Sequence, residues 1–177
     1  DLGDNATWAD PAFDDSKWDD IFVPAPWEDE GFPGYDGYAW YRKHFTVSKD
    51  LKNSIVYLHV GYVDDVSEVY LNGHMVGFAG KFPPNLHEAD VVYEKFPVPQ
   101  QYLNYTGDNV VAVRVYDHRL AGGIIRGKVG LFEPKEYLKP DYNLAGTWKF
   151  TTGDDEMWKE TSFNDAKWND AVVPGYW

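Results

Sequence analysis

The sequence predicts an all-β protein built as an antiparallel β-sandwich, and two observations support this. Short segments in which apolar and polar residues alternate follow one another along the chain, with turn-forming residues between them. No segment carries ten or more residues with the periodicity of an amphipathic helix. Many short strands joined by turns are typical of a sandwich.

The expected elements follow in order from this alternation. The strands cover residues 39–47, 55–60, 66–71, 90–98, 109–116, 128–132 and 147–150. Residues 69–77 predict a hairpin, because Asn72-Gly73 supplies the positive φ angles that a type I′ turn requires. Residues 99–103 predict a single helical turn between two strands.

The end of the chain repeats its beginning without a gap. Gly3 aligns with Gly153, and the offset stays constant to Trp27 and Trp177. Identical pairs include Trp8/Trp158, Phe13/Phe163, Asp15/Asp165, Lys17/Lys167, Trp18/Trp168, Asp20/Asp170, Val23/Val173 and Pro24/Pro174. The period is that of a whole domain, because solenoid repeats run about 20–50 residues. We therefore expect the chain to be a piece of a longer multidomain protein. The predicted domains are one sandwich over residues 1–135, a linker over 136–143 and the first part of a second copy over 144–177.

If every connection reverses the chain, as in antiparallel sheets, four loops gather at one end of the sandwich. These near-end loops are residues 28–38, 63–65, 79–89 and 117–127, and they are long, polar and rich in glycine. Sandwiches commonly carry function on loops gathered at one end. We therefore expect the candidate site among the near-end loops.

Composition excludes several classes of partner. The formal net charge is −13 and the pI about 4.6, whereas nucleic acids and anionic membrane surfaces select basic patches. No apolar run approaches the ~20 residues that span a bilayer, so we expect no membrane insertion. The absence of cysteine excludes disulfides and cysteine-ligated zinc. The aromatic content of 18% suits the apolar faces of sugar rings.

Several motifs together resemble the N-terminal sugar-binding domain of family 2 glycoside hydrolases, the β-galactosidase and β-glucuronidase group. They are Phe13-Asp14-Asp15-Ser16-Lys17-Trp18, Val23-Pro24-Ala25-Pro26-Trp27, Gly37-Tyr38-Ala39-Trp40-Tyr41-Arg42-Lys43, residues 63–73, and residues 109–117 with Gly122-Gly123-Ile124. The resemblance covers about residues 1–133 and implies a galactose-binding-domain-like jelly roll. It also implies a parent enzyme that hydrolyses O-glycosidic bonds of poly- or oligosaccharides with carboxylates on a separate TIM barrel. We expect that parent to be extracellular or periplasmic.

In that family a strand of the Trp-x-Phe type precedes the Gly-Asp pair, and the first copy has no such strand before Gly3. The second copy has it within residues 144–150, as Thr147-Trp148-Lys149-Phe150. An unpaired strand is open to pairing with other chains. We expect this strand to fill the vacancy, either in its own chain or by strand-swapped self-association through residues 144–150.

No acid lies in a recognisable nucleophile or acid/base motif, so we expect no catalytic residue in this chain. The candidate carbohydrate-binding residues are Trp27, Tyr35, Asp36, Asp64, Asp65, His118, Arg119 and Arg126. Trp27 and Tyr35 are expected at the surface, with a hydrophobic plug over the end of the barrel as the alternative. Asp64-Asp65 is alternatively a turn whose carboxylates accept hydrogen bonds from nearby backbone N–H groups.

We expect no cofactor and no metal site. The five histidines show no metal-ligand spacing. Asp14-Asp15 and Asn164-Asp165 would suit a structural calcium ion by their oxygen atoms, but Asx-type turns are the favoured interpretation. Trp18, Trp40, Trp148 and Trp168 are expected in core or edge positions.

Four functions remain open from the sequence. The leading one is a non-catalytic domain that binds carbohydrate or supports the substrate cleft of a multidomain glycoside hydrolase, with the catalytic domain of the same polypeptide as its partner. The alternatives are an independent carbohydrate-binding module, an accessory domain of a sialate-type acetylesterase, and a structural spacer. Sugar binding by the isolated chain would separate these classes.

Overall fold

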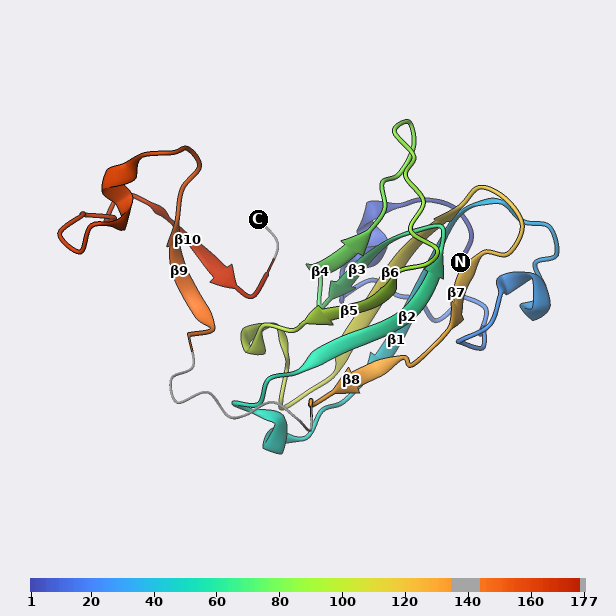
Figure 1. Ribbon diagram of the computed structural model, residues 1–177. Helices are drawn as coiled ribbons and strands as arrows, with labels where there is room; N and C mark the ends of the chain where they lie inside the picture. The colour runs from blue at the N-terminus through green and yellow to red at the C-terminus, as the bar shows by residue number, and fades with distance from the viewer. Residues whose placement is uncertain (135–143, 176–177) are drawn as a thin grey trace.

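The computed structural model describes residues 1–134 and 144–175, and the first range folds into two packed antiparallel sheets (Figure 1). The predicted antiparallel β-sandwich is confirmed. The first sheet has the order β1 (Gly37–Phe45), β6 (Asn109–Asp117), β3 (Val66–Leu71), β4 (His74–Ala79). The second sheet is centred on β2 (Tyr57–Asp64). β5 (Tyr93–Pro97) pairs with one edge of β2, and β7 (Gly123–Arg126) followed by β8 (Gly130–Phe132) pairs with the other edge.

Short 3₁₀ turns are the only helical elements in the described ranges. They are η1 (Ala6–Ala9), η2 (Trp27–Glu30), η3 (Lys49–Leu51), η4 (Gln100–Tyr102) and η5 (Glu156–Lys159). The helical turn predicted over 99–103 is confirmed as η4. Within the described residues no helix has the length and apolar character needed to cross a membrane.

Strand β6 organises the core because its inner face is buried and the first half of its outer face is buried as well. Val113 and Val115 pack with residues of the second sheet in the core cluster, and Val111 lies against that cluster. On the opposite face Val110 and Ala112 are 4% and 1% exposed. A slip of one residue would turn Val113 and Val115 outward and bring Arg114, which pairs with Asp4 and Glu68, into the core, so the register of β6 against β1 and β3 is fixed.

The N-terminal segment covers the outer face of the first sheet and is held there by Arg42. The side chain of Arg42 is 1% exposed and donates to Asp15 Oδ2 at 2.7 Å. It also donates to the backbone carbonyl oxygens of Trp8 and Asp10. Trp8 packs edge-on against Trp40, with ring centroids 6.2 Å apart. The planar guanidinium thus satisfies several acceptors at once, with five N–H donors in a fixed fork that a lysine ammonium does not offer.

The predicted hairpin joins β3 and β4 and has the expected backbone. Asn72 and Gly73 adopt φ angles of 50° and 80°. The Asn72 side chain also ties the turn to the rest of the domain: Nδ2 donates to Tyr102 O at 2.7 Å, and Oδ1 accepts from Val110 N at 2.8 Å.

The C-terminal part forms a two-stranded sheet of its own. β9 (Gly146–Phe150) pairs antiparallel with β10 (Asn169–Val173). The expectation that residues 147–150 fill the vacancy within their own chain is therefore wrong, because β10 takes the strand as a local partner. Trp148, expected in a core or edge position, is 47% exposed. The predicted linker over 136–143 lies outside the described residues.

Two strands were not predicted from the sequence. β7 lies in the glycine-rich segment expected to be a loop, and β10 lies in the repeated segment. Each is short and pairs with a strand that is not its immediate neighbour in the chain: β7 pairs with β2, which lies far away in sequence, and β10 pairs with β9 across residues 151–168. Their own residues therefore carry little alternation to reveal them.

Replacing Asn72 with alanine should lower the free energy of unfolding by about 2–4 kcal/mol, because it removes the side-chain hydrogen bonds and places alanine at a positive φ. Denaturant unfolding measures the change. Asn53→Ala is the matched control: Asn53 has φ 77° and is exposed, so only the backbone preference is lost, about 1 kcal/mol. Equal losses for the two variants would show that the Asn72 side-chain hydrogen bonds contribute nothing.

Candidate functional site

The near-end loops meet as the reversing topology predicts. The last residue of β6, Asp117, pairs with the first residue of β1, Gly37. The backbone N–H of Asp65 donates to Tyr116 O at 3.1 Å, and the backbone N–H of Ala89 donates to Asp65 O at 2.8 Å. The loops that follow β2, β4 and β6 are therefore bonded to one another at one end of the sandwich.

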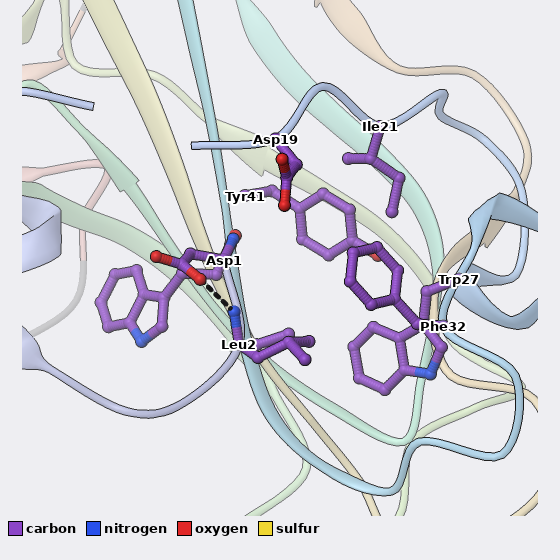
Figure 2. Close-up of a pocket in the computed structure, with 9 residues that line it drawn as sticks. Asp1, Leu2, Asp19, Ile21, Trp27, Phe32 and Tyr41 are labelled. Carbon is purple, nitrogen blue, oxygen red and sulfur yellow. Dashed lines mark hydrogen bonds between the residues drawn. The ribbon is translucent and has the colours of Figure 1, made fainter. Parts of the chain in front are cut away.

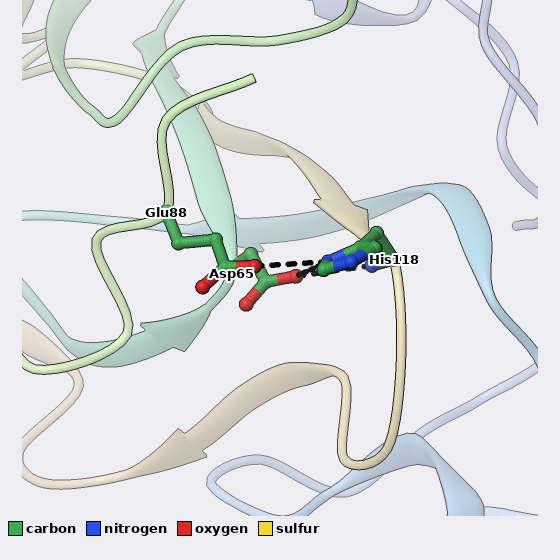
Figure 3. Close-up of side chains that lie close together, drawn as sticks. All are labelled: Asp65, Glu88 and His118. Atoms are coloured by element: carbon green, nitrogen blue, oxygen red, sulfur yellow. Dashed lines mark hydrogen bonds and ion pairs between the residues drawn. The ribbon is translucent and has the colours of Figure 1, made fainter.

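A polar cluster of Asp65, Glu88 and His118 lies at this junction (Figure 3). The backbone N–H of His118 donates to Asp65 Oδ2 at 3.0 Å. The ring atom Nδ1 of His118 lies 3.2 Å from the same oxygen and 3.0 Å from Glu88 Oε1. The Asp65 side chain is 6% exposed, whereas the side chains of Glu88 and His118 are each 35% exposed. The histidine is thus held by two carboxylates, and part of its ring faces solvent.

A second cluster shares Asp65 and adds Asp64 and Asp117. One carboxylate oxygen from each of the three lies within 4.8 Å of the others. Asp117 is fully buried, and its Oδ1 accepts from Arg119 N at 3.1 Å. Its Oδ2 is buried with no hydrogen-bond partner among the described residues. Such an orphaned oxygen on a buried acid is uncommon in folded proteins.

The surroundings of the three aspartates shift their pKa values in different directions. Burial, followed by the negative charges of Asp65, Asp36 and Glu28, raises the pKa of Asp117 to about 7. Burial also raises the pKa of Asp64, and its hydrogen bond to Asp65 adds to the effect. Burial opposes the ionisation of Asp65, but hydrogen bonds from Asp64 and His118 outweigh it and lower the pKa of Asp65.

The partly exposed members of the two clusters, His118, Glu88 and Asp64, can donate hydrogen bonds to a polyhydroxylated ligand and accept them from it. A protonated carboxyl group donates, an ionised carboxylate accepts, and a histidine ring does either. The three clustered aspartate oxygens are also of the type that a hard cation such as Ca²⁺ prefers. Some of these aspartate oxygens already have partners within the protein. Asp64 is hydrogen-bonded to Asp65, and Asp65 also accepts from the backbone N–H of His118 and contacts its ring.

Trp27 lies inside the domain, and Tyr35 is half-buried against it. Trp27 is 1% exposed, which contradicts the expected surface position. Its indole Nε1 donates to Tyr35 O at 3.1 Å, and the Tyr35 hydroxyl donates to Tyr38 O at 2.6 Å. Figure 2 shows Trp27 beside Phe32 in the wall of a pocket of about 140 Å³. The aromatic pair is the hydrophobic plug that was the alternative interpretation.

The remaining candidates divide between the cluster and its surroundings. Arg119 is 65% exposed in its side chain, and its Nη2 lies 3.7 Å from Glu88 Oε1. Asp36 is exposed and adds negative charge near Asp117. Arg126 stacks on the Tyr62 ring of β2, with the guanidinium carbon 4.2 Å from the centroid. Asp64, Asp65, His118 and Arg119 thus come together, whereas Arg126 packs on β2.

Three acids at this end were not among the candidate binding residues. Asp117 has a signal in the sequence. It lies two residues after Val115 and four after Val113, so the strand alternation places its carboxylate on the face that is expected to be buried. Glu28 accepts from Gly122 N at 3.1 Å, and Glu88 contacts His118. Neither has a detectable signal, since Glu28 lies in the short turn η2 and Glu88 in a loop, and neither segment is long enough to show periodicity.

The predicted Asx turns are present in both copies of the repeat. Asp14 Oδ1 accepts from Ser16 N at 3.1 Å, and Asn164 Oδ1 accepts from Ala166 N at 3.0 Å. Asp15 is occupied by Arg42. The first carboxylate pair is therefore explained by a turn and an ion pair.

Comparisons with known proteins agree on one group of enzymes. A family model described as the β-galactosidase second all-beta domain matches residues 2–120. The chain is 31% identical over 137 residues to a β-galactosidase of Thermoanaerobacter pseudethanolicus, and the match covers 64% of this chain and 17% of that protein. It is 31% identical over 128 residues to the β-galactosidase BoGH2A of Bacteroides ovatus, covering 64% of this chain and 14% of that protein.

A solved structure of Bacteroides uniformis β-glucuronidase shares the fold. The TM-score is 0.58 at 28% identity, and the match covers 70% of this chain and 15% of that chain. The chain therefore spans less than a fifth of the length of these relatives.

Asp117→Asn should stabilise the protein in a pH-dependent manner. The raised pKa of Asp117 means that the folded state keeps a proton that the unfolded state releases between about pH 4 and pH 7, so stability falls across this window. Asparagine removes that loss and keeps an oxygen for the N–H of Arg119. The variant's advantage in unfolding free energy should grow by about 1–2 kcal/mol between pH 4 and pH 8, measured by urea denaturation.

Asp29→Asn, at an exposed position of η2, serves as the control and should show no such growth. Parallel stability curves for Asp117→Asn and the natural chain would contradict the assignment of a buried, proton-holding Asp117.

Proposed function

Because this chain belongs to the family of the β-galactosidase second all-beta domain, a β-domain of family 2 glycoside hydrolases, we propose that it is non-catalytic and that its near-end loops border the substrate cleft. In this proposal the loops supply hydrogen-bonding groups to sugar hydroxyls. The substrate is a β-galactoside, a β-glucuronide or a related O-glycoside, in keeping with the names of the relatives. The chemistry itself belongs to a catalytic domain of the same polypeptide.

The observation that carries this proposal is the convergence of Asp64, Asp65, Asp117 and His118 at one end of the sandwich. His118 and Glu88 are partly exposed, whereas the acids behind them are buried. Partly exposed groups oriented by buried partners suit recognition, because their geometry is fixed before a ligand arrives.

The same geometry argues against catalysis by this chain alone. A retaining glycosidase needs two carboxylates roughly 5 Å apart that face the sugar from both sides of a cleft. Asp65 is 5% exposed and Asp117 is fully buried, so neither can face an entering sugar. We therefore assign the catalytic carboxylates to a TIM barrel elsewhere in the parent protein.

We also propose the finer assignments that the sequence resemblance implies. The domain is of the galactose-binding-like type, residues 144–175 begin a second copy of it, and the parent is an extracellular or periplasmic enzyme. Support for the second copy comes from its turns, since the N-terminal residues of η1 and η5 are capped alike by Asn5 and Asp155.

In a polypeptide that carries this chain with its catalytic domain, His118→Ala should raise KM for a chromogenic β-galactoside or β-glucuronide about three- to tenfold, the effect of one lost hydrogen bond. kcat should change little. His74→Ala is the control, since His74 is exposed beside the Asn72 hairpin at the opposite end. The isolated chain should hydrolyse neither substrate.

An unchanged KM in His118→Ala would contradict the cleft role. Turnover by the isolated chain that is lost in Asp65→Asn would contradict the non-catalytic assignment. Tight sugar binding by the isolated chain with a defined stoichiometry would favour the independent carbohydrate-binding module.

A further inference from the structure

Three carboxyl groups that belong to opposite sheets meet at the junction of the near-end loops. Asp64 is the last residue of β2 in the second sheet, Asp65 follows it, and Asp117 is the last residue of β6 in the first sheet. One carboxylate oxygen from each of them lies within 4.8 Å of the others. These three residues form the aspartate triad, which brings together the ends of two strands from the two sheets.

The aspartate triad concentrates negative charge that its neighbours do not balance. Among the described residues, no lysine or arginine side chain forms an ion pair with any of the three. Asp65 contacts the ring of His118 at 3.2 Å, but the further charges that act on the triad are those of Asp90, Asp36 and Glu28. Because like charges at this range repel, the three carboxylates are ionised together only when a cation lies among them.

The Asp117 side chain brings an unsatisfied acceptor to the aspartate triad. Asp117 is fully buried, and its Oδ1 accepts from Arg119 N at 3.1 Å. Its Oδ2 is buried too and has no hydrogen-bond partner in residues 1–134 and 144–175. Buried polar atoms in folded proteins nearly always have a partner, and an ion is one of the partners that complete such a group. The Asp117 carboxylate is therefore available to a ligand that enters the triad.

The ligand that fits the aspartate triad is a hard divalent cation. All three donors are carboxylate oxygens, without the nitrogen or sulfur atoms that structural zinc sites contain. Ca²⁺ takes about six to eight oxygen ligands in a flexible geometry, whereas Mg²⁺ demands a near-ideal octahedron. Asp64 is only partly buried, so an ion can enter from solvent and water can complete its coordination.

The neighbouring cluster of Asp65, Glu88 and His118 fits a cation less well. The Nδ1 atom of His118 lies 3.0 Å from Glu88 Oε1 and 3.2 Å from Asp65 Oδ2, so both carboxylates already have a partner in the ring. The guanidinium of Arg119 lies 3.7 Å from the same Glu88 oxygen and would repel an entering cation. Asp64 and Asp117, on the other side of Asp65, have no such basic partner among the described residues.

We propose that the aspartate triad is a Ca²⁺ site that ties the end of β2 to the end of β6. The ion bonds to one carboxylate oxygen from each of Asp64, Asp65 and Asp117 and takes the place of the partner that Asp117 Oδ2 lacks. Because its ligands belong to opposite sheets, the bound ion holds the near-end loops in one arrangement. The site does not require sugar binding, so its test is independent of the cleft role proposed above.

Calorimetric titration of the EDTA-treated full chain with CaCl₂ tests the proposal. A single Ca²⁺ ion should bind per chain, with a Kd between about 10 µM and 1 mM. Asp117→Asn should weaken binding at least about tenfold because it removes a charged ligand, and Asp64→Asn is the second variant if the first folds poorly. Asp36→Asn is the matched control: it removes the same charge from an exposed position at the same end but no ligand, so Kd should change less than about threefold.

Thermal unfolding gives a second readout. At a Ca²⁺ concentration of about 100 times Kd, the natural chain should melt on the order of 5–10 °C higher than in EDTA, because the ion binds the folded state. Asp117→Asn should lose most of this shift, whereas Asp36→Asn should keep it. MgCl₂ at the same concentration should produce a smaller shift in the natural chain.

Four results would overturn the proposal. The first is a natural chain that shows neither heat nor a melting shift at about 10 mM CaCl₂. The second is equal weakening by Asp36→Asn and Asp117→Asn, which would indicate diffuse attraction by charge instead of coordination. The third is binding that Glu88→Gln abolishes and Asp117→Asn leaves unchanged, because the ion would then lie in the cluster around His118. The fourth is tighter binding of Mg²⁺ than of Ca²⁺.

Discussion

The burial of the apolar inner face of β6 is the constraint on which the rest of the sandwich depends. A slip of one residue would turn this face outward and Arg114 inward, so β6 has one register with each neighbour and the positions of its two ends are fixed as well. At one end Asn109 is buried, and its Oδ1 accepts from Asn72 Nδ2 at 2.9 Å, which anchors the β3–β4 hairpin. At the other end Asp117 is buried where the near-end loops meet.

The same constraint creates the chemistry of the candidate site. The inner face of β6 continues past Val115 to Asp117, so a carboxylate occupies a position that packing would give to an apolar side chain. Its raised pKa reflects that burial, and its orphaned oxygen costs stability. Departures from good packing of this kind are expected at functional sites, where the stability lost is compensated elsewhere in the fold.

The two copies of the repeat separate local from tertiary effects. Residues 144–175 contain no arginine, yet the turns around Trp158 and Trp168 match those around Trp8 and Trp18. Local hydrogen bonds such as the Asx caps are therefore sufficient for these turns. In the first copy, the hydrogen bonds from Arg42 additionally hold the N-terminal segment against the sheet. Trp18 contacts Phe13 in this copy, and Trp168 makes the same contact with Phe163 in the second copy, which has no such arginine.

The sequence by itself determined the all-β class, the Asn72-Gly73 hairpin, the Asx turns and the grouping of the near-end loops. These features depend on alternation, on backbone preferences and on chain reversal, all of which are local. Only the tertiary structure decided that Trp27 is a buried plug, that β7 and β10 are strands, and that Glu88 contacts His118. Each of these depends on which distant segment lies opposite, and side-chain burial is set by that partner rather than by the residue's own neighbours in the chain.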